Sequence, residues 1–219
     1  MTRASTKDVL MQPAYTYAEA ARFLAVPNST VHSWVTGRPH FKHVVTPATR
    51  GGLSFTNLVE LHVLSALRSK GVRMPHIRKA LAILGRELDS KHPLADGGFF
   101  TSGPALFVRH LGKLAQISTD VQLVIQQALE QYISRVDRNP DGVPIRLYPT
   151  ILHTPDARVV VIDPAVAFGR PVLVGVGIPT TEIAQRFDAG DDLDFLAKDL
   201  GVTVAALSDV VRFEHRRAA

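Results

Sequence analysis

The 219-residue chain contains no cysteine. This absence excludes disulfide bonds, thiolate metal ligands and a cysteine nucleophile, and it agrees with a reducing compartment. Long hydrophobic runs are also missing: a membrane span takes about 20 apolar residues, whereas the most apolar stretch, Val159–Ile162, is followed directly by Asp163. Arg3 and Lys7 have no apolar segment behind them, so no signal peptide is expected. The sequence therefore predicts a cytoplasmic globular protein that does not enter a membrane.

Motifs of the common enzyme classes are absent too. The chain has no Gly-x-Ser-x-Gly, no phosphate-binding loop and no His-Glu-x-x-His. Gly175-Val176-Gly177 lacks the third glycine of a dinucleotide-binding turn, and Pro179 stands where that turn would lead into its helix. The sequence therefore predicts a protein without enzymatic activity and without a cofactor.

Histidines and carboxylates are present, but their spacing does not favour a metal site. His32, His40 and His43 are close in sequence, yet they lie across a predicted helix and a loop, without cysteines or a carboxylate pair beside them. The acidic residues between Asp188 and Asp194 do not have the spacing of a calcium-binding loop, and a helix start accounts for them. No bound metal is expected.

Positive charge is concentrated in the first part of the chain. The whole chain has a net charge of +5, but residues 1–80 hold 11 Lys/Arg against 3 Asp/Glu, a net charge of +8. Residues 81–219 hold 14 Lys/Arg against 17 Asp/Glu, a net charge of −3. This distribution favours a polyanionic partner for the first part only, with a solvated surface that has no partner as the alternative.

The segment after Tyr15 is typical of a helix-turn-helix. Thr16 and Glu19 have the spacing of a capping box at the start of a first helix, predicted over Tyr17–Leu24. Pro27 then interrupts the helical pattern, because proline disfavours helical backbone at the residue before it. A second helix is predicted over Ser29–Thr36, so two short helices are separated by a tight turn.

Residues 38–52 have a different character. Prolines and a glycine pair exclude a long helix there, whereas Phe41 and the pair Val44-Val45 suit short strands. Basic residues accompany them, so the segment is predicted to form a basic β-hairpin, or wing. Two amphipathic helices follow, over Phe55–Lys70 and Pro75–Leu88.

The middle of the chain mixes several patterns. Residues 89–104 are rich in Gly, Pro and Asp and predict a boundary between domains. A strand is predicted at Ala105–Val108 and another in Pro144–Leu152. Between them, an apolar stripe over Val121–Val136 predicts a long helix whose stripe is either core or a dimer seam.

The last part of the chain reads as a compact β-hairpin followed by three helices. The predicted elements are strands at Val159–Ile162 and Val172–Val176 and helices at Thr180–Phe187, Leu193–Leu200 and Thr203–Arg212. Candidate capping side chains begin the helices: Thr180, Asp192 and Thr203.

The predicted fold is mainly α with small β elements. It comprises a winged helix-turn-helix domain over 1–90, a middle α+β linker or dimerisation segment over 91–152, and a C-terminal β-hairpin plus three-helix domain over 153–219.

The segment from Tyr15 to Leu88 resembles the MerR-like winged-helix class. The resemblance rests on Thr30-Val31-x-x-Trp34, Leu53-Ser54-Phe55-Thr56-x-Leu58, Arg68-x-x-Gly71 and Ile77-Arg78. The sequence departs from the class at His32 and Ser33, where a basic residue often stands beside the tryptophan. Readout of bases is therefore expected to differ.

The C-terminal part resembles a bacterial domain of unknown function that occurs with type II toxin–antitoxin systems. The matching motifs are Val161-Ile162-Asp163-Pro164, Gly169-Arg170-Pro171-Val172, Gly175-x-Gly177-Ile178-Pro179-Thr180, Glu182-Ile183 and Phe187-x-x-Gly190. Gly177 stands where an arginine usually precedes the Ile-Pro pair, so no role of that arginine is carried over. A chain that carries these two domains in tandem resembles VapB-type antitoxins. The resemblance implies a transcriptional autorepressor that also binds and silences a PIN-like ribonuclease toxin.

In a domain of this kind, the second helix enters the major groove of double-stranded DNA, and a homodimer reads two half-sites. Val31, Trp34 and Val35 are assigned to the core. The other polar positions are predicted to contact DNA: Asn28, Ser29, Thr30, His32, Ser33 and Thr36. Asn28 suits adenine. Wing residues are predicted to contact phosphates or a minor groove: Arg38, Lys42, His43 and Arg50.

The C-terminal tail is a candidate for the toxin contact. An inserted arginine can neutralise the carboxylates that hold the metal of such a nuclease, and a solvated tail is the alternative. The predicted contacts are Arg212, Phe213, Arg216 and Arg217. The alternative function is a ligand-sensing MerR-like regulator whose middle region, roughly 97–152, encloses a small molecule.

Overall fold

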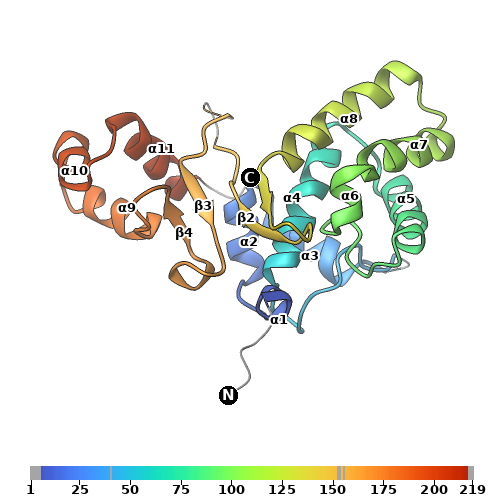
Figure 1. Cartoon of the computed structure of the whole chain (residues 1–219), viewed down its shortest axis with the longest axis horizontal. Helices are drawn as coiled ribbons and strands as arrows, with labels where there is room; N and C mark the ends of the chain where they lie inside the picture. Colours follow the sequence, from blue (N-terminus) through green and yellow to red (C-terminus); the bar gives the residue numbers. More distant parts are fainter. Residues whose placement is uncertain (1–5, 40, 152–153, 155, 217–219) are drawn as a thin grey trace.

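The computed structural model describes residues 6–39, 41–151, 154 and 156–216 (Figure 1). The fold is mainly helical, with a small antiparallel sheet and an N-terminal helix-turn-helix, so the predicted fold class is confirmed. The helices are α1 (Thr6–Met11), α2 (Tyr17–Leu24), α3 (Asn28–Thr36), α4 (Phe55–Ser69), α5 (Met74–Glu87), α6 (Gly97–Thr101), α7 (Gly103–Ala115), α8 (Thr119–Ile133), α9 (Thr180–Asp188), α10 (Leu193–Leu200) and α11 (Val204–His215). The strands are β1 (Val136–Arg138), β2 (Pro144–Leu147), β3 (Val160–Ile162) and β4 (Pro171–Leu173), and a 3-10 turn, η1, covers Ala167–Gly169.

Helices α2 and α3 form the helix-turn-helix. The predicted capping box is confirmed: the Glu19 amide donates to Thr16 Oγ1 at 3.2 Å, and the Thr16 amide donates to the Glu19 carboxylate at 2.8 Å. Ala25 ends α2 with a left-handed backbone (φ 51°). Pro27 directly precedes α3, where its missing amide proton has no cost.

Helix α4 is the central element, and α1, α2, α8 and β2 all contact it. Its apolar side chains are buried around the whole circumference of the helix, which is the pattern of a helix enclosed in a core. Polar residues are enclosed with them: Asn57 is 0% exposed, and Glu60 and His62 are 2% exposed. The consequence is that each of these polar groups needs a partner inside the protein.

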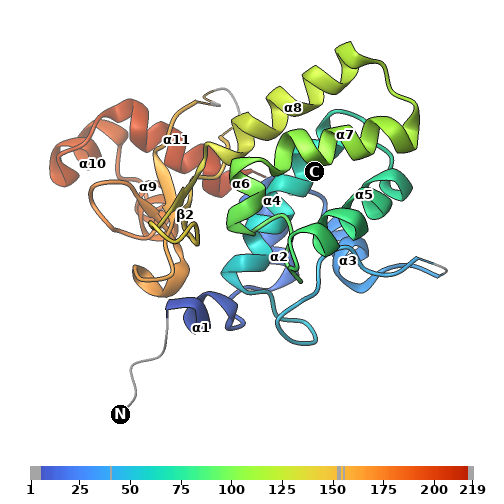
Figure 2. The same cartoon turned by 45° about the vertical axis from the view of Figure 1, so that its right-hand side comes forward.

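The expected strand at Ala105–Val108 is wrong, because these residues lie inside α7. Pro104 occupies the first turn of α7, where proline is favoured. A four-residue apolar run does not distinguish a strand from a buried helix. In Figure 2, α7 lies beside α5 and α8, and it packs against both of them.

The boundary predicted at residues 89–104 is not an exposed linker. Phe99 and Phe100 of α6 are buried in the same hydrophobic core as the rest of the chain. The stripe on α8 is core in its second half, where Ile125 and Leu129 are buried, whereas Val121 in its first turn is 47% exposed. The dimer seam and the three domain ranges stay predictions.

The strands form one antiparallel sheet in the order β1-β2-β3-β4. Strands β1 and β2 come from the middle segment, and β3 and β4 form the predicted C-terminal hairpin. The two pairs join where Leu147 lies opposite Ile162. The C-terminal hairpin therefore continues the sheet of the middle segment, as Figure 1 shows beside α2.

Two of the three predicted C-terminal helix caps are confirmed. Asp192 accepts a hydrogen bond from the Phe195 amide at 2.7 Å, and Thr203 accepts one from the Ala206 amide at 3.2 Å. The prediction for Thr180 is wrong, because Pro179 holds the cap position. The buried Thr180 hydroxyl instead bonds to Glu214 and to the Pro171 carbonyl oxygen, at 2.5 and 3.2 Å.

We expect acid to destabilise the fold through His62. Its Nε2 lies 3.0 Å from the Tyr132 carbonyl oxygen, so the neutral ring donates this bond and attaches α4 to α8. Burial lowers the pKa of His62 from 6.5 to about 4. Between these pH values the unfolded chain binds a proton that the folded protein excludes. The free energy of unfolding should therefore fall, by up to about 3 kcal/mol, as the pH drops from 6.5 towards 4.

The measurement is denaturant unfolding at pH values from 7.5 to 4.5. His62→Gln keeps a hydrogen-bond donor but does not titrate, so it should lose most of the pH dependence between 6.5 and 4.5. His43→Gln replaces an exposed histidine and is the matched control for the loss of an imidazole. Equal pH dependence in His62→Gln and in the wild type would contradict the assignment.

Candidate nucleic-acid interface

Helix α3 has an apolar face and a polar face. Val31, Trp34 and Val35 are at most 2% exposed and belong to the core, as their spacing predicts. On the other face, Asn28, Ser29, His32 and Thr36 are exposed, and Thr30 and Ser33 are half-buried. The structure thus brings the six predicted contacts together on one accessible face, and their contact with DNA stays a prediction.

Two residues of this face are held to each other. The Thr36 hydroxyl lies 3.1 Å from His32 Nδ1 and donates to the His32 carbonyl oxygen at 2.8 Å. The His32 ring also meets the Tyr17 ring edge-on, with centroids 5.8 Å apart. These contacts fix the side-chain positions before any ligand binds, which lowers the entropy cost of binding.

The predicted wing is a loop rather than a hairpin. Within the described part of residues 38–52, only the isolated bridges Arg38–Phe41 and Thr49–Gly52 occur, so the expected strands are wrong. The amides of Val44 and Val45 donate to the Trp34 carbonyl oxygen at 2.7 and 3.2 Å. These two hydrogen bonds take the place of those that a neighbouring strand would accept. The loop therefore folds back onto the end of α3.

Gly37 makes the sharp exit from α3 possible. Its φ is +83°, and a Cβ at this position would lie 2.5 Å from the Phe41 carbonyl oxygen. Only glycine adopts this backbone without strain and leaves room for that oxygen.

Asn57 of α4 holds the second half of the loop. Its side-chain oxygen accepts hydrogen bonds from the amides of Ala48 and Ser54, at 3.0 and 3.1 Å. Its side-chain nitrogen donates to the Thr46 carbonyl oxygen at 2.8 Å. A single buried amide group thus fixes the loop to the core.

The four predicted basic contacts of the loop are exposed: Arg38, Lys42, His43 and Arg50. Arg78 of α5 supports the loop from below, since its Nε donates to the Lys42 carbonyl oxygen at 3.0 Å and its guanidinium lies over the Phe41 ring at 5.6 Å. Burial, together with the charge of Arg38, lowers the pKa of Arg78.

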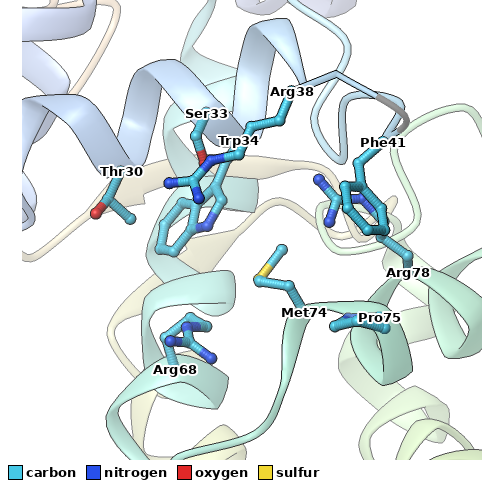
Figure 3. A pocket seen from close by; sticks show the side chains of 9 residues that line it. All are labelled: Thr30, Ser33, Trp34, Arg38, Phe41, Arg68, Met74, Pro75 and Arg78. Atoms are coloured by element: carbon cyan, nitrogen blue, oxygen red, sulfur yellow. The ribbon is translucent and has the colours of Figure 1, made fainter.

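A hollow of about 250 Å³ lies between α3, the loop and the start of α5. Figure 3 shows three arginines around it, each from a different element: Arg38 follows α3, Arg68 lies in the last turn of α4 and Arg78 lies on α5, with Trp34 between them. None of the described residues that line the hollow carries a carboxylate. Such an arrangement suits an anion, above all a phosphate group.

Arg68 and Arg78 were not among the contacts predicted from the sequence. A signal was present, because the segment from Arg68 to Lys79 holds five basic residues and no acidic one. The predicted helices alone did not show that the turn between them faces α3.

The predicted toxin contacts in the tail lie in different environments. Phe213 is 0% exposed and stacks on Phe23 of α2, with centroids 6.3 Å apart, so the ring belongs to the core, which the prediction of a toxin contact at this residue did not anticipate. An apolar ring at this position on an amphipathic helix packs into the core. Arg212 is exposed and Arg216 is half-buried. Arg217 lies outside the described residues.

Polar contacts attach α11 to α2 beside these rings. The Glu214 carboxylate is ion-paired with Arg22 of α2 and also accepts the Thr180 hydrogen bond. Arg216 donates to the Phe23 carbonyl oxygen at the end of α2, and burial lowers the pKa of Arg216 to about 9. The C-terminal helix is therefore docked on the first helix of the helix-turn-helix.

No group of three or more His, Asp or Glu side chains within the described residues is placed to hold a metal ion. No helix in that part of the chain is long and apolar enough to cross a membrane.

We expect Asn57→Ala to release the loop over residues 38–52 and to lower the free energy of unfolding by about 2–3 kcal/mol, because it leaves the Ala48 and Ser54 amides and the Thr46 carbonyl oxygen without their partner. Hydrogen exchange at the Ala48 amide should become faster, and chemical denaturation gives the stability. Thr56→Ala is the matched control, since the Thr56 hydroxyl bonds to the Leu10 carbonyl oxygen and not to the loop. Unchanged exchange at Ala48 would count against the role of Asn57.

Two segments match protein families. Residues 13–81 match a family described as "Putative DNA-binding HTH domain". Residues 160–213 match one described as "Protein of unknown function (DUF433)". The first match covers α2 to α5 up to Leu81, and the second covers β3 to α11 up to Phe213.

Along most of its length the chain is similar to proteins of Mycobacterium tuberculosis (strain ATCC 25618 / H37Rv). It is 28% identical to "Putative antitoxin VapB45", over 91% of this chain and 92% of that protein. It is 25% identical to "Uncharacterized protein Rv2308", over 95% and 93%. The crystal structure of Rv2018 from Mycobacterium tuberculosis has a TM-score of 0.73 and 26% identity, covering 91% of this chain and 98% of that chain. Together, these matches support an antitoxin-like helix-turn-helix protein.

Proposed function

We propose that the chain is an antitoxin and transcriptional autorepressor without enzymatic activity. Residues 1–90 bind operator DNA, and the C-terminal part, residues 153–219, neutralises a PIN-like ribonuclease toxin. Similarity to a protein named as an antitoxin, along most of both chains, supports this function. The observation that carries the DNA-binding role is the polar face of α3 beside a hollow that three arginines line.

On DNA, α3 enters the major groove with its first turn towards the base edges. Asn28 hydrogen-bonds adenine, and the coupled pair His32 and Thr36 faces the groove further along the helix. The loop over residues 38–52 takes the place of the wing in a MerR-like domain, and its cations contact phosphates. A phosphate group occupies the arginine-lined hollow, where Arg68 and Arg78 add to the loop cations.

In this arrangement, short polar side chains read the base sequence, and guanidinium groups supply most of the affinity for DNA. Phosphate contacts release counterions, so binding weakens steeply with salt. Two copies bind together, and each copy reads one half-site. The symmetry of the operator then follows the symmetry of the protein dimer.

The toxin contacts exposed groups of the C-terminal helices. Phe213 and Arg216 are occupied at the contact with α2, so among the described tail residues Arg212 remains for a partner, and Arg217 stays a predicted contact. Arg212 has a side chain that is 53% exposed, paired at 3.0 Å with Asp209 one turn earlier on α11. In the complex, Arg212 exchanges this intramolecular partner for a carboxylate of the toxin.

A ligand-sensing regulator is the second candidate, and one observation favours it. A hollow of about 770 Å³ lies against residues 89–98 and the β1–β2 turn, with His92 on its wall. His92 is bonded to the buried Glu60 at 2.9 Å, and Glu60 lies 3.3 Å from the side-chain nitrogen of Asn57, which holds the DNA-facing loop. A ligand at His92 would thus be connected to that loop. Such a regulator binds DNA but retains no nuclease on co-purification.

We expect Arg38→Ala to weaken binding to the upstream operator by about five- to tenfold and to reduce the salt slope by about 1, because one phosphate contact is lost. The measurement is a mobility shift at several salt concentrations. Asn28→Ala should instead relax sequence preference at one base pair. Arg86→Ala removes an equally exposed cation outside the hollow and is the matched control. A wild-type chain that does not retard this DNA at low salt would contradict both candidate functions.

We expect Arg212→Glu to weaken binding to the product of the neighbouring open reading frame by about tenfold or more, since a favourable ion pair becomes a repulsion. DNA binding should stay unchanged. Co-purification followed by titration calorimetry measures the effect, with Arg109→Glu on α7 as the control for an added charge. The point variant is preferable to deleting the tail, because deletion removes Phe213 from the core. Wild-type affinity in Arg212→Glu would exclude this residue from the toxin contact.

A further inference from the structure

The turn between β3 and β4 presents an aromatic ring to solvent. Phe168 is 92% exposed, and its backbone is left-handed, with φ 57° and ψ 32°. The preceding residue, Ala167, is also left-handed, with φ 47°. Left-handed backbone is unfavourable for residues with a Cβ, and such conformations cluster at functional sites. An exposed apolar ring on a strained turn has two costs in the isolated chain, which suggests that a partner compensates for them.

The turn holds this ring in a fixed position. The Gly169 amide donates to the Val166 carbonyl oxygen at 2.9 Å, and the Arg170 amide donates to the Ala167 carbonyl oxygen at 3.1 Å. At Gly169, with φ +78°, a Cβ would lie 2.5 Å from Tyr15 Oη, so the turn packs directly on Tyr15. Phe168 is therefore a preorganised projection and not a side chain at the tip of a loose loop.

A hollow of about 360 Å³ lies next to Phe168. Its wall is mixed: Val9 of α1, Pro13, Ala14 and Phe55 are apolar, Gln12 is polar, and Phe168 itself forms one side. Tyr15 also lines it, and the buried Tyr15 hydroxyl has no hydrogen-bond partner among the described residues. Figures 1 and 2 both show the β3–β4 turn beside α1. Because Phe168 is among the residues that line the hollow, the projection and the hollow share one face of the molecule.

We propose that this face is the contact between two copies of the chain, with Phe168 of each copy inserted into the hollow of the other. A face that carries both a projection and an adjacent hollow is complementary to itself under a two-fold axis, as a closed dimer requires. A toxin would need only one of the two features. Aromatic anchors seated in pockets supply much of the energy of such interfaces. This dimer rests on the proposed function, in which two copies of the chain read two half-sites. Self-association is measured without DNA or toxin, so its failure is distinguishable from a failure of DNA or toxin binding.

The test is sedimentation velocity of the full-length protein from about 0.5 to 100 µM, a range that covers micromolar dimers. Phe168→Gly removes the ring and suits the left-handed backbone, so the dimer dissociation constant should rise about tenfold or more. The Tm of the dilute monomer, where dimerisation adds no stability, should stay equal or increase. Ala14→Arg fills the hollow and should weaken the dimer similarly. Phe195→Ala truncates another exposed ring, 55% exposed on α10, and should change nothing.

A mixture of the two variants gives the decisive result. Phe168→Gly keeps the Ala14 side of its hollow, although Phe168 itself lines the hollow, and Ala14→Arg keeps its ring. The mixed dimer therefore retains one ring in one hollow, whereas neither variant dimer retains any, and it should form more tightly than either of them. A wild-type chain that stays monomeric over the whole range would overturn the proposal. Association of Phe168→Gly with wild-type affinity would also overturn it. This holds if Val124→Ser on α8 weakens the dimer instead, and it holds if Phe168→Gly loses only toxin binding.

Discussion

Helix α4 is enclosed by the rest of the chain, so its polar side chains must find their partners within the protein. Three of them attach three different segments. Asn57 holds the loop over residues 38–52, Glu60 binds His92 in the connection after α5, and His62 binds the end of α8 at Tyr132. Apolar packing alone tolerates small sliding between elements, whereas these hydrogen bonds specify one register. The positions of the loop and of α8 therefore depend on polar residues inside the central helix.

Local patterns in the sequence predicted most of the helices, because capping residues and helical periodicity are local signals. They failed where a distant partner decides the structure. Val44 and Val45 suit a strand, but their amides are used by the carbonyl oxygen of Trp34. Thr180 suits a cap, but the Glu214 carboxylate, 34 residues away, takes its hydroxyl group. In both cases a hydrogen bond between separate elements outweighs a local preference.

For the candidate site, too, local sequence patterns predicted one part and missed another. The polar face of α3 was predictable, since three apolar residues at helical spacing leave the remaining positions to solvent. The arginine-lined hollow was not, because Arg68 and Arg78 reach it only through the turn between α4 and α5, which brings them opposite Arg38. Phe213 likewise has the sequence context of a tail residue, and only its stacking on Phe23 shows that it belongs to the core.

The docking of α11 on α2 connects the two ends of the molecule physically. Helix α2 packs against α3 and also against α11, so it supports the proposed recognition helix and receives the C-terminal helix. The Glu214 carboxylate binds both Arg22 of α2 and Thr180 at the start of α9. Because one carboxylate serves both helices, α11 cannot shift without breaking a contact to α2 or to α9. In the proposed function, a toxin that displaces α11 would therefore disturb the support of α3, and DNA binding and toxin binding would not be independent.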